Sequence, residues 1–144
     1  MRPNFYKKLA LSALIAGSLS GVAHAQRANE NYELRAFYGD KQGNNVVVID
    51  VKRMQLEAMV PTEGLTPYPV DRAGHLDKVY AITRGSFSMD VIDAETLENI
   101  GLIPLNHIPR SGESFNSRLG LAIVAGADRP ITSVIDVVND SVVA

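Results

Sequence analysis

The stretch VVVIDVKRMQLEAMVP at residues 46–61 decides the fold, because it recurs without a gap as MDVIDAETLENIGLIP at residues 89–104. A third copy begins as SVIDVVNDSVVA at residues 133–144. The Ile-Asp pairs of the three copies, at residues 49–50, 92–93 and 135–136, stand 43 residues apart. Each pair ends an apolar, β-branched run and precedes a polar hairpin, so each copy predicts two strands joined by a turn.

The aspartates of these pairs, Asp50, Asp93 and Asp136, have a structural explanation. A carboxylate at the end of a strand can accept backbone N–H bonds in the turn that follows. We therefore predict that the three side chains shape the hairpins and bind no ligand.

A second match lies upstream of each copy. Residues 67–83, which contain VYAIT, align with residues 109–125, which contain LAIVA, at an offset of 42. The one-residue slip falls in the next turn, where chain length varies at little cost. Repeats of roughly 40–45 residues with several short strands are typical of β-propeller blades. The sequence therefore predicts an all-β fold, with blades of four antiparallel strands and repeats at about 34–61, 67–104 and 109–144.

The number of blades is the main difficulty of this prediction. The innermost strands are expected at Tyr68–Ala73 and Arg110–Phe115, but residues 26–32 contain no recognisable strand for the first copy. About two and a half blades are present, an incomplete propeller, whereas closed propellers have typically 4–8. We expect the missing blades to come either from a longer chain, of which this would be the amino-terminal part, or from self-association. The last residues lie inside a strand pattern, which favours the longer chain.

The amino terminus predicts export. Residues 1–25 combine a basic start, an apolar centre at Leu9–Val22 and the small-residue ending Ala23-His-Ala25, as in a secretory signal peptide cleaved after Ala25. The apolar centre is interrupted and short for a membrane span. We expect a periplasmic or secreted protein, comprising residues 26–144, with no membrane span after cleavage.

The composition of the exported part narrows its partners. Cleavage removes three of the 14 basic residues and leaves 11 against 16 acidic residues, so nucleic acid is not an expected partner. The chain has no cysteine for disulfides, c-type haem attachment or thiolate ligands.

The order of motifs in the second copy resembles a known family. Gly64-x-x-Pro67, then DKVYAIT at residues 77–83, then Val91-Ile-Asp93-x-x-Thr96 is similar to the YVTN-type (YncE-like) β-propeller repeat. In that repeat a Tyr-Val-x-Asn strand precedes a Val-x-Val-Ile-Asp-x-x-Thr hairpin. The resemblance covers about Leu34–Ala144. Residues 80–83 read YAIT, and one hairpin of three keeps Asp-x-x-Thr, which implies a divergent subgroup.

Candidate site residues come from the segments expected to line the propeller channel, residues 67–75 and 106–116. The candidate ligand-binding residues are Asp71, Arg72, His107, Arg110 and Glu113, and the candidate metal ligands are His107 and, after it, His75. Asp71 and Glu113 occupy the same place in the repeat, so the two carboxylates could bind a cation or act as an acid–base pair. The alternative is an Asp neutralised by the adjacent Arg in a water-filled channel.

Two functions follow from these residues. The first is an exported propeller module that binds an unknown protein or small-molecule ligand at the channel face. The alternative is the amino-terminal fragment of a periplasmic metal-dependent oxidoreductase of the nitrous-oxide-reductase-like or thiocyanate-dehydrogenase-like propeller type, whose copper ligands come from many blades. No cofactor is evident, because two histidines without cysteine do not complete a copper or zinc site, so a transition metal is expected only in a completed propeller. With no catalytic motif visible, catalytic residues are unassigned and the sequence favours a non-enzymatic role.

Overall fold

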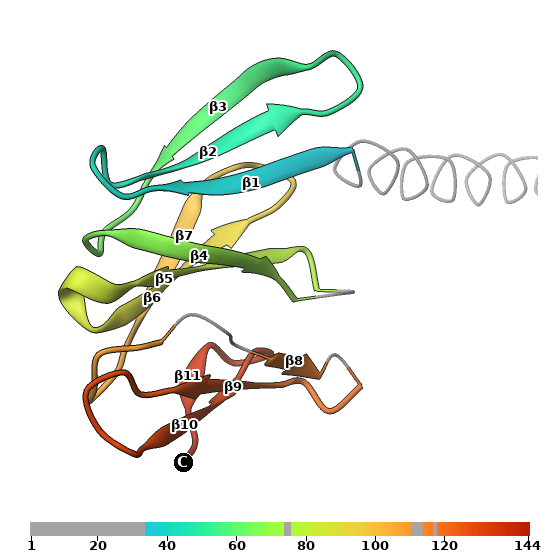
Figure 1. The fold of residues 1–144 in the computed structure, drawn as a ribbon. Helices are drawn as coiled ribbons and strands as arrows, with labels where there is room; N and C mark the ends of the chain where they lie inside the picture. Colours follow the sequence, from blue (N-terminus) through green and yellow to red (C-terminus); the bar gives the residue numbers. More distant parts are fainter. Residues whose placement is uncertain (1–33, 74–75, 111–113, 117) are drawn as a thin grey trace, which may run out of the picture. The chain divides into compact units, whose positions relative to one another are not determined.

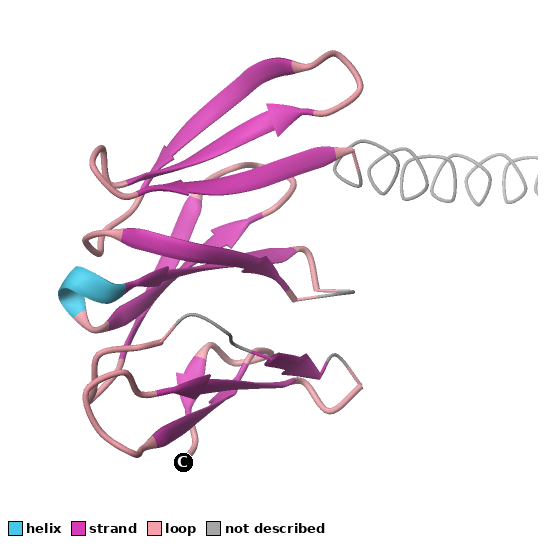
Figure 2. Ribbon diagram, viewed as in Figure 1, coloured by secondary structure: helices cyan, strands magenta, loops and turns pink. Residues whose placement is uncertain are grey.

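The computed structural model describes residues 34–73, 76–110, 114–116 and 118–144, and Arg35–Ala144 form one compact unit. Three antiparallel sheets make up the described part of the chain (Figures 1 and 2). The predicted signal peptide, the segment 26–32, His75 and Glu113 lie outside the described residues. Among the residues that are described, no helix is long and apolar enough to cross a bilayer.

Each sheet corresponds to one copy of the repeat and is called a blade below. Blade 1 has the order β1-β2-β3, with β1 at Arg35–Asp40, β2 at Asn45–Asp50 and β3 at Gln55–Pro61. Blade 2 has the order β4-β5-β6-β7, with β4 at Pro67–Arg72, β5 at Lys78–Thr83, β6 at Ser88–Asp93 and β7 at Asn99–Pro104. A short 3-10 helix, η1 at Arg84–Ser86, joins β5 to β6. Blade 3 has the order β8-β9-β10-β11, with β8 at Ser114–Asn116, β9 at Leu121–Ala125, β10 at Thr132–Asp136 and β11 at Ser141–Val142.

The all-β prediction of an incomplete propeller with four-stranded antiparallel blades is confirmed. The inner strands differ in their bounds from the prediction. Strand β4 spans Pro67–Arg72, one residue earlier at each end than predicted, and the Leu76 N–H donates to the Ala73 carbonyl at 3.0 Å in the turn that follows. Strand β8 continues to Asn116, one residue beyond the predicted end.

The hairpin role of the repeated aspartates is also confirmed. The Asp50 carboxylate accepts the N–H of Arg53 at 2.9 Å. The Asp93 carboxylate accepts two turn N–H groups and so does that of Asp136, at 2.8–3.0 Å. The fourth residue after each aspartate, namely Met54, Leu97 or Asp140, has a left-handed backbone with φ of 53–60°. The copies therefore share the geometry of the hairpin, including a conformation that the sequence did not indicate.

The core lies between successive blades. The first cluster joins Val46, Val48 and Val60 of blade 1 to Val79, Ala81, Ile92 and Ala94 of blade 2. The second joins the other side of blade 2, including Tyr80, Ile82, Met89, Val91 and Ile103, to Ala122, Val124, Ile135 and Val137 of blade 3. Strand β5 is an almost continuous buried run because a blade covers each of its faces.

Candidate functional site

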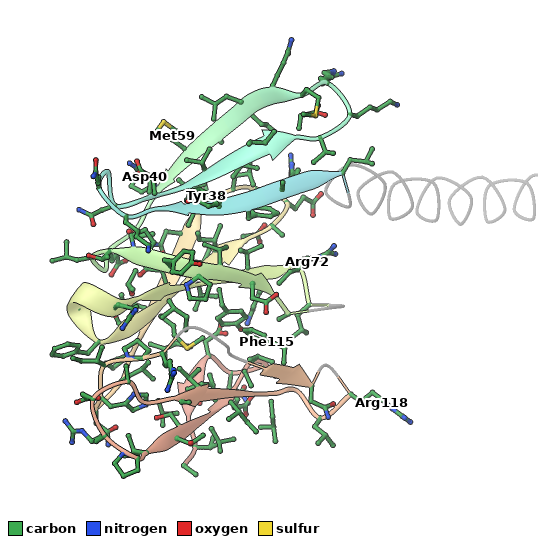
Figure 3. All side chains as sticks on the ribbon, in the orientation of Figure 1. Tyr38, Asp40, Met59, Arg72, Phe115 and Arg118 are labelled. Atoms are coloured by element: carbon green, nitrogen blue, oxygen red, sulfur yellow. The ribbon has the colours of Figure 1, made fainter. Side chains whose placement is uncertain are left out.

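Strand β4 carries the predicted polar residues of blade 2. It is an edge strand that pairs with β5, and Asp71 lies opposite Tyr80 while Arg72 lies opposite Val79. The Asp71 side chain is exposed, and its carboxylate accepts the backbone N–H of Arg72 at 2.8 Å. The Arg72 side chain is half-buried at the end of the strand (Figure 3). Asp71 and Arg72 thus both lie on the edge strand of blade 2, and the contact given between them is the hydrogen bond from the Arg72 backbone N–H to the Asp71 carboxylate.

An aromatic ring and a lysine extend this site toward the start of the same strand. Tyr68 is exposed on β4, and the Lys41 ammonium, from the turn between β1 and β2, lies 3.9 Å from the ring centroid. This distance is typical of a cation–π contact. Neither residue was predicted, because Lys41 belongs to blade 1 and reaches β4 only through the packing of the two blades. Strand β4 therefore carries an exposed carboxylate, a half-buried guanidinium and a tyrosine ring covered by a lysine.

The candidate residues of blade 3 are only partly placed. Arg110 has an exposed side chain, and its backbone N–H donates to the Ala125 carbonyl at 2.7 Å. Within the described residues, no ion pair joins Asp71 to Arg110. The predicted partnership of Asp71 with Glu113 stays a prediction, since Glu113 is outside the described part.

His107 is a buried residue at the junction of blades 2 and 3. Its Nδ1 lies 3.2 Å from the Ile108 carbonyl and its Nε2 lies 3.0 Å from the Ser133 hydroxyl. A carbonyl only accepts, so Nδ1 donates and Nε2 accepts the Ser133 proton in the neutral ring. A metal at Nε2 would have to displace this hydroxyl. In the chain as far as it is described, no three His, Cys, Asp or Glu side chains are grouped to hold a metal ion.

The equivalent junction between blades 1 and 2 is built on Asp90, which no sequence motif singled out. Asp90 is fully buried, and its carboxylate accepts the N–H of Glu63 at 2.6 Å and that of Gly64 at 3.2 Å. The Thr83 hydroxyl at 3.0 Å and the Asn99 amide at 2.7 Å also donate to it. The carboxylate therefore fixes the segment that leads into β4.

The two junctions correspond through the repeat. Asp90 and Ser133 are 43 residues apart, and so are the residues they bind, Gly64 and His107. In each case a polar side chain on the third strand of a blade, β6 or β10, hydrogen-bonds to the segment that leads into the first strand of the same blade, β4 or β8. The 43-residue spacing contained this signal, but the change from Asp to Ser concealed it.

Arg35 fixes blade 1 to the hairpin of blade 2. Its Nη1 donates to the Ala94 carbonyl at 2.7 Å and to the Glu95 carbonyl at 3.3 Å. Its Nε also lies 2.9 Å from a carboxylate oxygen of Glu57 on β3. The arginine therefore links two strands of its own blade to the next blade along the chain.

Lys78 repeats this clamp 43 residues later. Its Nζ donates to the Val137 and Val138 carbonyls, both at 3.3 Å, and pairs with the Asp140 carboxylate at 2.6 Å. The buried hydroxyl of Tyr80 lies 2.6 Å from the Asp140 carboxylate and 3.0 Å from the Val137 carbonyl, and its single proton is shared between these two acceptors. Burial, together with the hydrogen bond to Asp140, raises the pKa of Tyr80 above its ordinary value, so the hydroxyl stays protonated.

These features define the class of protein. Successive antiparallel sheets that pack face to face through a 43-residue repeat are blades of a β-propeller. No protein-family model matches the chain, and the comparison with curated proteins found no match.

Comparison with solved structures agrees with this class. Hydrazine synthase of Kuenenia stuttgartiensis superposes with a TM-score of 0.71 at 20% identity, over 76% of this chain and 31% of that one. The dihydro-heme d1 dehydrogenase NirN gives a TM-score of 0.64 at 14% identity, over 77% and 27%. Apo AztD of Citrobacter koseri gives 0.58 at 10% identity, over 71% and 28%. The chain spans less than a third of each of these structures, and identities this low show the fold alone.

Proposed function

We propose that this chain is an exported β-propeller module that binds a ligand or protein partner through the face formed by its inner strands. The observation that carries the proposal is the exposed edge of β4. Asp71, Arg72 and the Lys41-capped ring of Tyr68 lie there, whereas most of strands β5 and β6 is buried between blades. Exposed polar and aromatic groups on a rigid strand are the usual components of a binding surface.

The similar structures supply precedents for such a role. The NirN structure is a complex with DHE, so a related blade arrangement can accompany ligand binding. We place the chain in a divergent subgroup of the YVTN-type propellers, on the motif order at residues 64–96. The alternative role in a metal-dependent oxidoreductase stays a prediction, and the hydrogen bonds of His107 to Ser133 and Ile108 do not favour it.

The binding proposal is tested by affinity capture from a periplasmic extract with the full chain as bait. The bound protein and small-molecule fractions are identified by mass spectrometry. Arg72→Glu reverses the charge at the end of β4 and should abolish capture of the bound species. Arg129→Glu is the control, because it reverses the charge of a basic residue in the β9–β10 turn of blade 3, where Arg129 is exposed and paired with Asp128. Equal capture by both variants, or no species retained by the wild type, would refute the binding role.

The export component is tested separately by mass spectrometry of the protein recovered from cell fractions. We expect a periplasmic chain that begins at Gln26. A cytoplasmic chain that retains residues 1–25 would contradict export and leave the binding proposal untouched.

A further inference from the structure

The face of blade 1 that points away from blade 2 is apolar. Tyr38 pairs with Val47 on β2, and Val47 pairs with Met59 on β3, so the three side chains share one face of the sheet. Tyr38 is 60% exposed and Met59 is 51% exposed (Figure 3). The opposite face contains Val46, Val48 and Val60, which are buried against blade 2. Nothing in the described part of the chain covers the first face.

Blade 3 also has a face that none of the described residues covers, at the other end of the series. Ala122 and Val124 on β9 are buried against blade 2. Ile123 lies between them, points to the opposite side of the sheet and is 49% exposed. It pairs with Val134 on β10, so an apolar patch continues across the neighbouring strand.

The repeat indicates which apolar residues Ile123 would pack against in a neighbouring blade. At the first junction Phe37 packs against the cluster that contains Val79, Ala81, Ile92 and Ala94. At the second junction Tyr80, 43 residues after Phe37, packs with Ala122, Val124, Ile135 and Val137, each 43 residues after its counterpart. Ile123 is the next residue in this series.

The apolar group that would receive Ile123 is on blade 1. The residues 43 positions before Val79, Ala81, Ile92 and Ala94 are Ala36, Tyr38, Ile49 and Val51, and all four are apolar. Tyr38 and Val51 are exposed. Blade 3 therefore carries one half of an interblade contact, and blade 1 carries the other half. The same contact already occurs between blades 1 and 2 and between blades 2 and 3.

The charges at the two ends fit the same pairing. Arg35 and Lys78 donate to the hairpin of the next blade, but the residue 43 positions after Lys78 is Leu121. The hairpin that it would meet on blade 1 contains Lys52 and Arg53, and Arg53 has a 76% exposed side chain. An arginine or lysine at position 121 would be repelled by the positive charges of this hairpin, whereas Leu121 is not.

We infer that the outward face of blade 3 in one copy docks on the outward face of blade 1 in a second copy. Two such contacts join two copies, and their six described sheets fall within the range of closed propellers. The inference goes beyond the proposed binding role and does not depend on it. The other possible occupant, a blade that is not in this chain, would leave the protein monomeric.

The test is sedimentation equilibrium of the chain in its expected exported form, residues 26–144. We expect twice the mass of one chain for the wild type. Ile123→Glu places a charge in the centre of the contact and should weaken dimerisation at least about 100-fold. Ile100→Glu is the matched control, because Ile100 is the same residue at 50% exposure on β7 and should leave the dimer intact.

A compensating change tests the pairing itself. In the inferred dimer Ile123 faces Tyr38 of the second copy, so the double variant Tyr38→Lys with Ile123→Glu should restore the dimer. Circular dichroism confirms that each variant is folded. A monomeric wild type, equal effects of Ile123→Glu and Ile100→Glu, failure of the double variant, or an open-ended polymer would each overturn the two-copy ring.

Discussion

Replacing the buried carboxylate of Asp90 tests whether one side chain sets the junction between blades 1 and 2. Asp90→Ala removes the common acceptor of four donors. Two of these keep a second partner, because the Thr83 hydroxyl also bonds the Ser88 hydroxyl at 2.8 Å and the Asn99 amide also reaches the Pro61 carbonyl at 3.3 Å. The cost therefore falls mainly on the N–H groups of Glu63 and Gly64.

The magnitude follows from the burial of these two groups. Gly64 is buried, and a buried donor that loses its acceptor costs about 1–3 kcal/mol. Glu63 is exposed, so water can replace part of its bond and about 1 kcal/mol is lost. We expect Asp90→Ala to lower the free energy of unfolding by about 2–4 kcal/mol in total, a large share of the stability of a small domain.

The assay is urea unfolding followed by far-ultraviolet circular dichroism, with the free energy extrapolated linearly to water. Asp71→Ala is the control, because the exposed Asp71 carboxylate accepts one backbone N–H and should change stability by less than about 0.5 kcal/mol. If Asp90→Ala is no more destabilising than Asp71→Ala, the junction does not depend on this carboxylate and the reasoning is wrong.

Three further changes probe the other contacts. Tyr80→Phe keeps the buried ring but removes the hydroxyl that lies against Val137 and Asp140. We expect the free energy of unfolding in urea to fall by about 1–2 kcal/mol. An unchanged free energy would show that this hydroxyl does not stabilise the contact with blade 3. Ser133→Ala leaves Nε2 of the buried His107 without its donor, which should cost about 1–2 kcal/mol, and Ser141→Ala on the exposed end of blade 3 is the neutral comparison. Hydrogen bonds from the side chain and backbone of Asn139 hold the pKa of Asp136 below its ordinary value, so the unfolded chain binds more protons in acid. This contribution to stability is present above about pH 4 and is lost as the pH falls through the lower folded pKa. Urea midpoints of wild type and Asp136→Asn, measured from pH 2 to 7, should converge toward low pH, and parallel curves would contradict the assignment.

The regular parts of the fold were predictable because they repeat. The Ile-Asp pairs located β2, β6 and β10, and the upstream match located β5 and β9 within one or two residues. Period-2 burial and turn chemistry act locally, so one sequence is enough to reveal them. The left-handed residues at Met54, Leu97 and Asp140 were not predictable, because none of the three is a glycine and their residue types differ.

The candidate site was predicted less completely. The predicted inner strand did place Asp71 and Arg72 on β4, where the Asp71 side chain is exposed and the Arg72 side chain is half-buried. The Lys41–Tyr68 contact joins residues of different blades, so no local pattern could indicate it. His107 was expected to face a ligand because it precedes an inner strand, but the same position lets it turn toward Ser133 in the blade junction.

The repeat also separates positions that hold blades together from positions that are free to vary. Residues 43 apart that agree in chemistry, such as Arg35 with Lys78 or Phe37 with Tyr80, contact the next blade. The inner strands follow the 42-residue offset instead, and there Tyr68 corresponds to Arg110, so the two copies differ in chemistry. Where residues 43 apart agree, the contact with the next blade keeps the two copies alike, although other junction positions differ, as Asp90 and Ser133 do. A residue on the open edge is constrained only by what binds there. Any ligand specificity of this chain should therefore depend on Tyr68, Arg72 and Arg110, and substitutions at the exposed Tyr68 and Arg110 should alter binding without a measurable loss of stability.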